Sequence, residues 1–91
     1  MAITVITFGT FDLFHVGHLN ILKRAKELGD RLVVGISSDN MNMKEKNKVA
    51  LIDQDDRAAI VRAIRYVDEV FFEESLSLKA EYIKMYKADI L

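Results

Sequence analysis

The amino-acid sequence predicts an α/β protein built on a doubly wound, parallel β-sheet. Apolar runs that are too short for helices alternate along the chain with segments whose apolar residues recur at helical spacing. Because helices of about a dozen residues separate these runs, the strands are expected to pair in parallel through right-handed crossovers. Such a sheet binds ligands beyond the carboxyl ends of its strands, which here are residues 9–18, residues 37–39 and the segment after Phe71.

The first half of the chain contains two predicted strands with a helix between them. Residues 3–8 are β-branched and aromatic and are followed by Gly9, which is typical of a buried strand. The next residues predict a helix, because apolar side chains recur at Leu19, Leu22, Ala25 and Leu28. Gly29 follows at the place where a left-handed C-terminal cap is expected. Residues 31–37 are a second apolar run, and we interpret them as the second strand.

The second half begins with a polar segment, residues 38–52, which we expect to be the longest loop of the chain. Asp53 is a suitable N-cap for the next helix, and charges that suit the helix dipole follow it: Asp55 and Asp56 near the start, Arg62 and Arg65 near the end. A third strand is predicted over residues 66–72 and a third helix over residues 76–88. Residues 89–91 resemble the first residues of a fourth strand.

Length and composition exclude several classes of protein. A chain of 91 residues predicts a single domain over residues 1–91, and its formal net charge of -1 argues against a general nucleic-acid or membrane-surface binder. The absence of cysteine excludes disulfides, thiolate zinc sites and cysteine nucleophiles. No apolar run reaches the about 18 residues that span a bilayer, and no signal-peptide pattern is present. We expect a cytoplasmic protein without a nucleic-acid or membrane partner.

The two histidines of the chain lie at the predicted start of the first helix. His15 and His18 flank a Val-Gly pair where unpaired backbone N–H groups and the helix dipole favour an anion. Their spacing of three residues places both imidazoles on one face of the helix. Gly9 and Gly17 have no side chain, so a phosphate can approach the backbone closely. The pattern therefore predicts a phosphate site.

Two other interpretations of the histidine pair remain. A single histidine at a helix start is most often a half-exposed polar residue, but a pair preceded by Thr10 and Asp12 favours a site. Two histidines also bind zinc in some proteins, although here a third ligand and the His-Glu-x-x-His spacing are missing.

The segment GTFDLFHVGH, residues 9–18, resembles the signature of the HxGH nucleotidyltransferases. Together with RAKELGDRLVVGISSD and RYVDEV it is similar to the glycerol-3-phosphate cytidylyltransferase branch, from Ile3 to about Val70 and weakly beyond. The resemblance implies a Rossmann-like sheet with strand order 3-2-1-4-5. It also implies that a small phosphomonoester, glycerol 3-phosphate above others, attacks the α-phosphorus of CTP to give CDP-glycerol and pyrophosphate. The resemblance also implies a Mg²⁺ cofactor, a homodimer and a role in making cell-wall or capsule precursors. It does not indicate which residues bind the metal ion.

The same resemblance assigns roles to individual residues. His15 and His18 donate hydrogen bonds to the phosphates, Thr10 adds a hydroxyl, and the backbone N–H groups of Phe11 and of the helix start complete the cradle. The family's two lysines fall on Lys46 and Lys48, on the acceptor side, with Lys44 as a substitute. Arg57 and Arg65 match the arginines that the family uses for phosphate at either end of the second helix. Apart from the resemblance, three aspartates near strand ends or their turns are candidates to hold Mg²⁺ or the ribose: Asp12 first, then Asp39 and Asp68.

Two blocks of the family pattern are missing from the chain: a Gly-Asp-Asp-Trp turn and an Arg-Thr-Glu-Gly-Ile-Ser-Thr-Thr segment. We therefore expect a domain truncated on its C-terminal side, inside the fourth strand. Two alternatives to the cytidylyltransferase stay open. One is an adenylyltransferase of the same superfamily, and the other is a non-catalytic nucleotide-binding module on the same fold.

Overall fold

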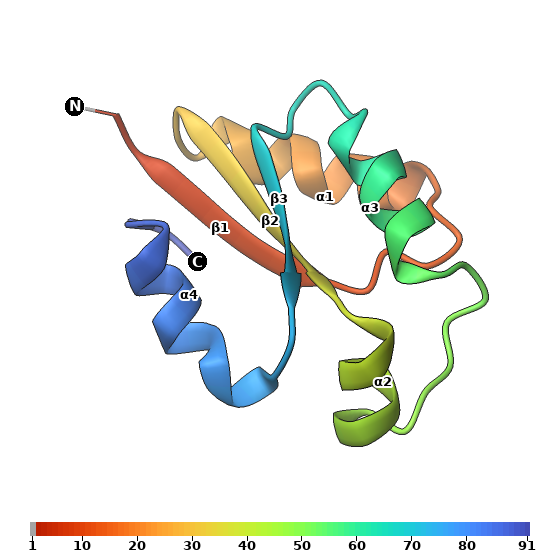
Figure 1. The fold of residues 1–91 in the computed structure, drawn as a ribbon. Helices are drawn as coiled ribbons and strands as arrows, with labels where there is room; N and C mark the ends of the chain where they lie inside the picture. Colours follow the sequence, from red (N-terminus) through yellow and green to blue (C-terminus); the bar gives the residue numbers. More distant parts are fainter. Residues whose placement is uncertain (1) are drawn as a thin grey trace.

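The computed structural model describes residues 2–91, in which strands and helices alternate along the chain (Figure 1). Strand β1 pairs in parallel with β2, and β2 pairs in parallel with β3. The predicted α/β class with a parallel sheet is thereby confirmed. The elements are β1 (Thr4–Gly9), α1 (Val16–Glu27), β2 (Arg31–Ser37), α2 (Asp39–Glu45), α3 (Gln54–Arg62), β3 (Glu69–Glu73), the 3₁₀ turn η1 (Leu76–Leu78) and α4 (Lys79–Met85).

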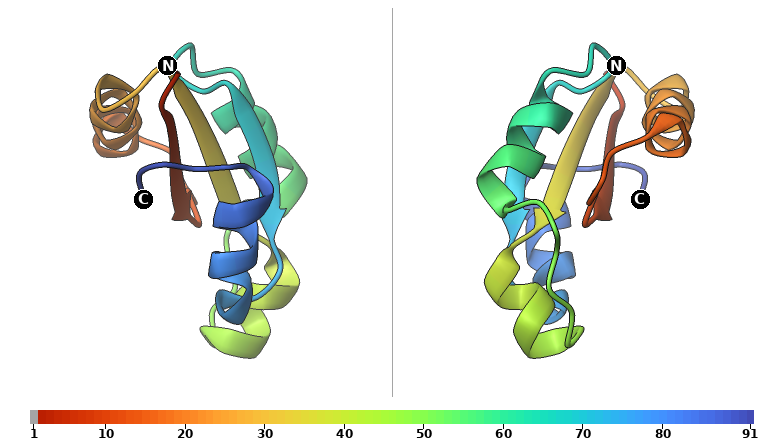
Figure 2. Two further views of the ribbon diagram at one scale, coloured as in Figure 1. Left: turned by 90° about the vertical axis from the view of Figure 1, so that its left-hand side faces the viewer. Right: turned by 90° about the vertical axis from the view of Figure 1, so that its right-hand side faces the viewer.

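The sheet is covered on both faces. Helix α3 lies in front of it in the right-hand view of Figure 2, where α1 stands beside β1, and α4 lies in front in the left-hand view. Because side chains alternate along a strand, Val5 belongs to the core under α1 and α3, whereas Ile6 packs against α4. In the part of the chain that the structure describes, no helix is long and apolar enough to cross a membrane.

The last residues of the chain lie on the edge of β1 that faces away from β2. Ile90 forms a parallel bridge with Val5, and its carbonyl oxygen accepts the N–H of Ile6 at 2.9 Å. The N–H of Ile90 donates to the carbonyl oxygen of Thr4 at 3.2 Å. The predicted start of a fourth strand beside β1 is confirmed, so the strand order begins 3-2-1-4.

The expected loop over residues 38–52 was wrong in its first half, which is helix α2. Ser38 caps this helix, because its hydroxyl accepts the N–H of Met41 at 3.0 Å. Only Met41 and Asn42 of the helix are buried, so its apolar periodicity is too short to detect in the sequence. Helix α2 extends past the carboxyl ends of the strands (Figure 1).

Gly29 does not adopt the left-handed conformation that was expected of it. Helix α1 ends on Leu28 in a right-handed conformation, and none of the glycines has a positive φ. Close packing explains the glycine instead, because a Cβ atom at this position would lie 2.7 Å from the carbonyl oxygen of Ile3. The later elements are also shorter than predicted, since β3 begins at Glu69 and α4 ends at Met85.

Candidate active site

The loop from β1 to α1 is held by an aromatic side chain that turns inward. Phe11 has a positive φ of 54° and is only 6% exposed, and its ring packs 5.6 Å from the ring of His18. A Cβ atom on Gly9 would lie 2.7 Å from the Phe11 ring. Glycine is therefore needed at the end of β1 because the buried ring occupies the space of a side chain.

His15 and His18 cap the start of α1 reciprocally. The N–H of His15 donates to Nδ1 of His18 at 3.1 Å, and the N–H of Gly17 donates to Nδ1 of His15 at 3.0 Å. Each Nδ1 must be unprotonated to accept, so the neutral rings carry their proton on Nε2. A Cβ atom on Gly17 would lie 2.6 Å from the His15 ring, which explains why glycine stands between the histidines.

The two imidazoles lie against each other, with ring centroids 4.1 Å apart. Burial and the proximity of His15 lower the pKa of His18 below its ordinary value of 6.5. His18 is therefore neutral at pH 7, and its Nε2–H is a hydrogen-bond donor to a ligand without the desolvation cost of a buried cation. The sequence predicted the pair and its position, but not the mutual cap that selects the tautomer.

Lys46 connects the carboxyl ends of the first two strands. Its Nζ lies 3.1 Å from the hydroxyl oxygen of Ser37 and 3.4 Å from that of Thr10. Lys48 is tied to α2, because its N–H donates to the carbonyl oxygen of Asn42 at 2.9 Å. Lys44 lies exposed on α2. The structure thus brings Lys46 together with Thr10, as expected of residues beyond adjacent strand ends.

Arg57 is fully buried beneath this site and binds oxygen atoms of the protein. Its Nη1 donates to the carbonyl oxygens of Thr10 at 2.8 Å and Ser37 at 2.9 Å, and its Nε donates to that of Ile52 at 2.8 Å. Its Nη2 forms an ion pair of 2.6 Å with Asp39. The guanidinium therefore joins the ends of β1 and β2 to the segment before α3. Sequence reasoning missed this positioning role, because burial of a charged side chain depends on elements distant in the chain.

Asp12 anchors the segment that leads into α3. Its two carboxylate oxygens accept the N–H groups of Leu51 and Ile52, both at 2.9 Å. These hydrogen bonds, the one from Leu51 foremost, lower the pKa of Asp12 below its ordinary value of 3.8. Asp39 is engaged as well, since its Oδ2 accepts the N–H of Gln54 at 3.1 Å besides its ion pair with Arg57.

Both carboxylates are thus engaged by the protein, although each keeps further acceptor sites. Within residues 2–91, no group of three or more His, Asp or Glu side chains is arranged to hold a metal ion. Mg²⁺ characteristically binds through one or two carboxylates together with substrate phosphates. Asp12 and Asp39 are therefore the residues that would hold a Mg²⁺ ion arriving with a phosphorylated ligand.

We expect Asp12→Asn to loosen the segment before α3. The side-chain NH₂ group of the asparagine would face a backbone N–H, so one of the two hydrogen bonds would be lost. Hydrogen exchange at Leu51 and Ile52 should therefore accelerate about 10-fold or more. The lowered pKa also means that the wild-type carboxylate contributes stability above pH 3.8 that is lost as the pH falls through the folded value. Asp55→Asn, exposed in the first turn of α3, is the control. Unchanged exchange in Asp12→Asn would contradict the anchoring role.

Arg65 lies apart from the other predicted site residues. It follows α3 in the turn before β3, at the amino ends of the strands, and its Nη2 donates to the Tyr66 hydroxyl at 3.1 Å. Asp68 lies at the same end, where it accepts the N–H of Leu32 at 2.7 Å and pairs with Lys26 at 2.6 Å. The structure does not bring these two residues to the edge that holds the histidines.

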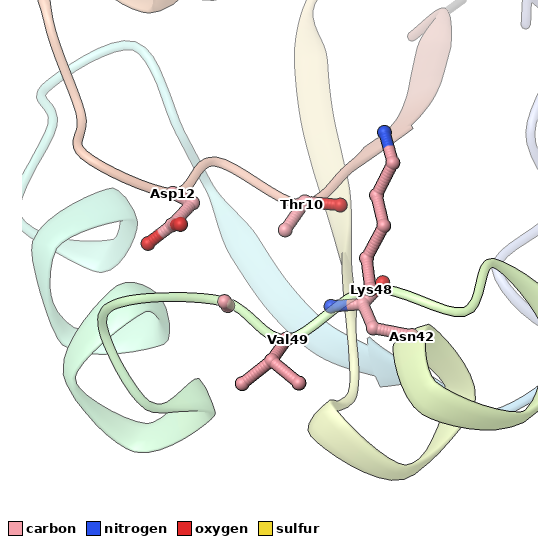
Figure 3. A pocket seen from close by; sticks show the side chains of 6 residues that line it. Thr10, Asp12, Asn42, Lys48 and Val49 are labelled. Atoms are coloured by element: carbon pink, nitrogen blue, oxygen red, sulfur yellow. The ribbon is translucent and has the colours of Figure 1, made fainter.

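A cavity of about 230 Å³ opens beside the β1–α1 loop (Figure 3). Five of its lining side chains are labelled in the figure, and the full set is Thr10, Asp12, Asn42, Lys48, Val49 and Ala50. Three of these residues were predicted for the site from the sequence. Asn42 was not, because an asparagine in a polar segment carries no sequence signal of its burial.

Comparison with known proteins identifies the family. The model of the cytidylyltransferase-like family matches residues 6–91. The chain belongs to this family. The resemblance found in the sequence is thereby confirmed, and it extends beyond Val70 to the end of the chain.

The relatives of this cytidylyltransferase-like chain carry two different names. A glycerol-3-phosphate cytidylyltransferase from Bacillus subtilis is 48% identical over 94% of the chain and 66% of its own length. A FAD synthase from Pyrococcus abyssi is 44% identical over 98% of the chain and 60% of its own length. The chain thus spans about two thirds or less of these proteins. A solved structure, a lipopolysaccharide core biosynthesis protein from Thermoplasma volcanium, matches with a TM-score of 0.87 at 29% identity, covering 98% of this chain and 71% of that one.

The geometry of this cytidylyltransferase-like chain suits the binding of anionic oxygens. The start of α1, the Nε2–H groups of the two histidines and the Lys46 ammonium all follow the carboxyl ends of β1 and β2. Preorganised donors of this kind stabilise charge that develops on phosphate oxygens.

Proposed function

We propose that the protein transfers CMP from CTP to a small phosphomonoester, with glycerol 3-phosphate as the favoured acceptor. A phosphate oxygen of the acceptor forms a bond to the α-phosphorus of CTP, and the bond from that phosphorus to the bridging oxygen breaks. The products are CDP-glycerol and pyrophosphate. The observation that carries the proposal is the mutual cap of His15 and His18, which makes both Nε2–H groups donors at the start of α1.

In this proposal the two histidines bind the triphosphate and stabilise the charge that develops on the departing pyrophosphate. Thr10 adds a hydroxyl donor, and Lys46 and Lys48 hold the acceptor phosphate. Asp12 and Asp39 would hold a Mg²⁺ ion together with the nucleotide phosphates, and the ion would neutralise part of their negative charge. Following the resemblance, we also propose a cytoplasmic homodimer that makes a cell-wall or capsule precursor.

A second candidate is an adenylyltransferase that uses ATP and a flavin acceptor, which the FAD synthase relatives favour. A third is a nucleotide-binding module without turnover. Titrating the full-length protein with CTP and ATP, each with Mg²⁺, and then measuring pyrophosphate release with glycerol 3-phosphate and with FMN separates the three. We expect CTP and glycerol 3-phosphate to give turnover. Turnover only with ATP and FMN selects the second candidate, and binding without turnover selects the third.

The lysines provide a test of the acceptor side. Lys46→Ala and Lys48→Ala should each raise the KM for glycerol 3-phosphate about 10-fold or more, because each removes a charge-assisted hydrogen bond to phosphate. The KM for CTP should stay within about threefold. Lys84→Ala, exposed on α4, is the matched control and should leave both constants unchanged. A change confined to the KM for CTP would show that these lysines bind the nucleotide.

A further inference from the structure

Asn42 is a buried side chain whose polar atoms have no partner. The residue is 1% exposed, and neither Nδ2 nor Oδ1 forms a hydrogen bond within residues 2–91. Native structures rarely retain a buried amide without partners, because burying it without hydrogen bonds costs free energy. The residue lies at the wall of the cavity of about 230 Å³, although its Nδ2 and Oδ1 atoms are covered by neighbouring groups (Figure 3). A ligand that enters this cavity and displaces the groups covering the amide can supply the missing hydrogen bonds.

The chemistry of the amide selects the kind of ligand. Nδ2 donates and Oδ1 accepts, so both are satisfied only by a group that accepts and donates. A phosphate oxygen only accepts and an ammonium only donates, whereas a hydroxyl does both. Asp12 and Lys48 line the same cavity with opposite charges, and the Lys48 ammonium is the group there that can bind an anionic part of a ligand. The lining thus fits a phosphate that carries hydroxyl groups.

The size and the lining of the cavity restrict the ligand further. Sites for drug-sized ligands measure about 300–1,000 Å³ and are lined largely by apolar and aromatic side chains. This cavity is smaller, and its six lining residues include no aromatic side chain. Four of them are polar: Thr10, Asp12, Asn42 and Lys48. Such a lining suits a short polyol better than a flat aromatic ring system such as a flavin.

We infer that Asn42 is a specificity-determining residue that hydrogen-bonds the hydroxyl groups of a small polyol phosphate, whose phosphate lies at Lys48. This inference rests on the proposed function, because the polyol phosphate is the acceptor of that reaction. It gives a role to a buried amide that has no hydrogen-bond partner within the described residues. The ribose of the nucleotide also carries neighbouring hydroxyl groups. The experiment therefore distinguishes binding of the polyol phosphate from binding of the ribose.

Asn42→Leu is the informative variant, because leucine has a similar volume and no polar atoms. Binding of glycerol 3-phosphate and of propyl phosphate, which lacks the hydroxyl groups, is measured by calorimetry on the full-length protein. We expect the wild type to prefer glycerol 3-phosphate by about 10-fold or more and Asn42→Leu to bind both equally. The variant should unfold at the same temperature as the wild type or higher, because no buried amide remains unpaired. Asn40→Leu, exposed on the same helix, is the control.

Equal binding of glycerol 3-phosphate and propyl phosphate by the wild type would overturn the inference, and so would a preference for glycerol 3-phosphate that persists in Asn42→Leu. If Asn42→Leu instead lost affinity for CTP alone, the amide would be assigned to the ribose of the nucleotide. A folded wild type that shows the preference for glycerol 3-phosphate but releases no pyrophosphate from CTP would refute the proposed function and leave the Asn42 site standing. If Asn42→Leu does not fold, Asn42→Ser, which shortens the side chain, takes its place in the same comparison. A large loss of stability in both variants with an unchanged binding preference would assign Asn42 a structural role only.

Discussion

Removing either histidine side chain should lower kcat of the full-length protein about 10²-fold or more. Losses of this size follow when an enzyme loses one preorganised hydrogen-bond donor that stabilises the charge developing in the transition state. The variants His15→Asn and His18→Gln separate the loss of the donor from the loss of the helix cap. Asparagine is a good N-cap and glutamine completes a capping box at the third helical position, so both keep the acceptors that close the start of α1. Each variant still removes an imidazole Nε2–H. The measurement is steady-state release of pyrophosphate.

Alanine variants serve as the comparison, because they lose both the donor and the cap. We expect His15→Ala to lose about 1 kcal/mol of unfolding free energy, as other N-cap deletions do, while His15→Asn loses less. Both should lose turnover to a similar degree. Turnover within about threefold of the wild type in the folded asparagine and glutamine variants would remove the histidines from the chemistry.

Arg57→Met should be the most destabilising single substitution in the site. It leaves three carbonyl oxygens, those of Thr10, Ser37 and Ile52, without their donor. The bond to Ser37 is buried and those to Thr10 and Ile52 are part-buried, so the free energy of unfolding should fall by about 2 kcal/mol or more. That corresponds to a Tm about 10 °C or more lower in a domain of this size. Urea and thermal unfolding measure both quantities.

Arg62→Met provides the matched control on the same helix. Arg62 is exposed in the last turn of α3, so its replacement should change the unfolding free energy by no more than about 0.5 kcal/mol. Equal stability of the two variants would mean that the buried guanidinium contributes nothing to the packing of the strand ends. If kcat of Arg57→Met falls by more than the fraction of protein that is unfolded, the loop that carries Thr10 has also shifted in the folded molecules.

Local patterns in the sequence were sufficient for most of the fold. Short apolar runs located the three strands, helical apolar spacing located helices α1, α3 and α4, and Asp53 was correctly predicted to cap α3. The start of the fourth strand at residues 89–91 was also found, because the spacing between helix and strand follows from local length alone. Helix α2 was missed, since only two of its residues are buried and polar side chains cover the rest.

The sequence by itself determined the α/β class, the family and the residues that gather beyond β1 and β2, because strand ends follow from periodicity and a helix start follows from its caps. Only the tertiary structure decided the states of those residues. The buried guanidinium of Arg57 and the engaged carboxylate of Asp12 depend on segments 18 to 47 residues away, and the unpaired amide of Asn42 depends on the packing around it. Burial and hydrogen-bond satisfaction are properties of the packed environment, which local spacing does not specify.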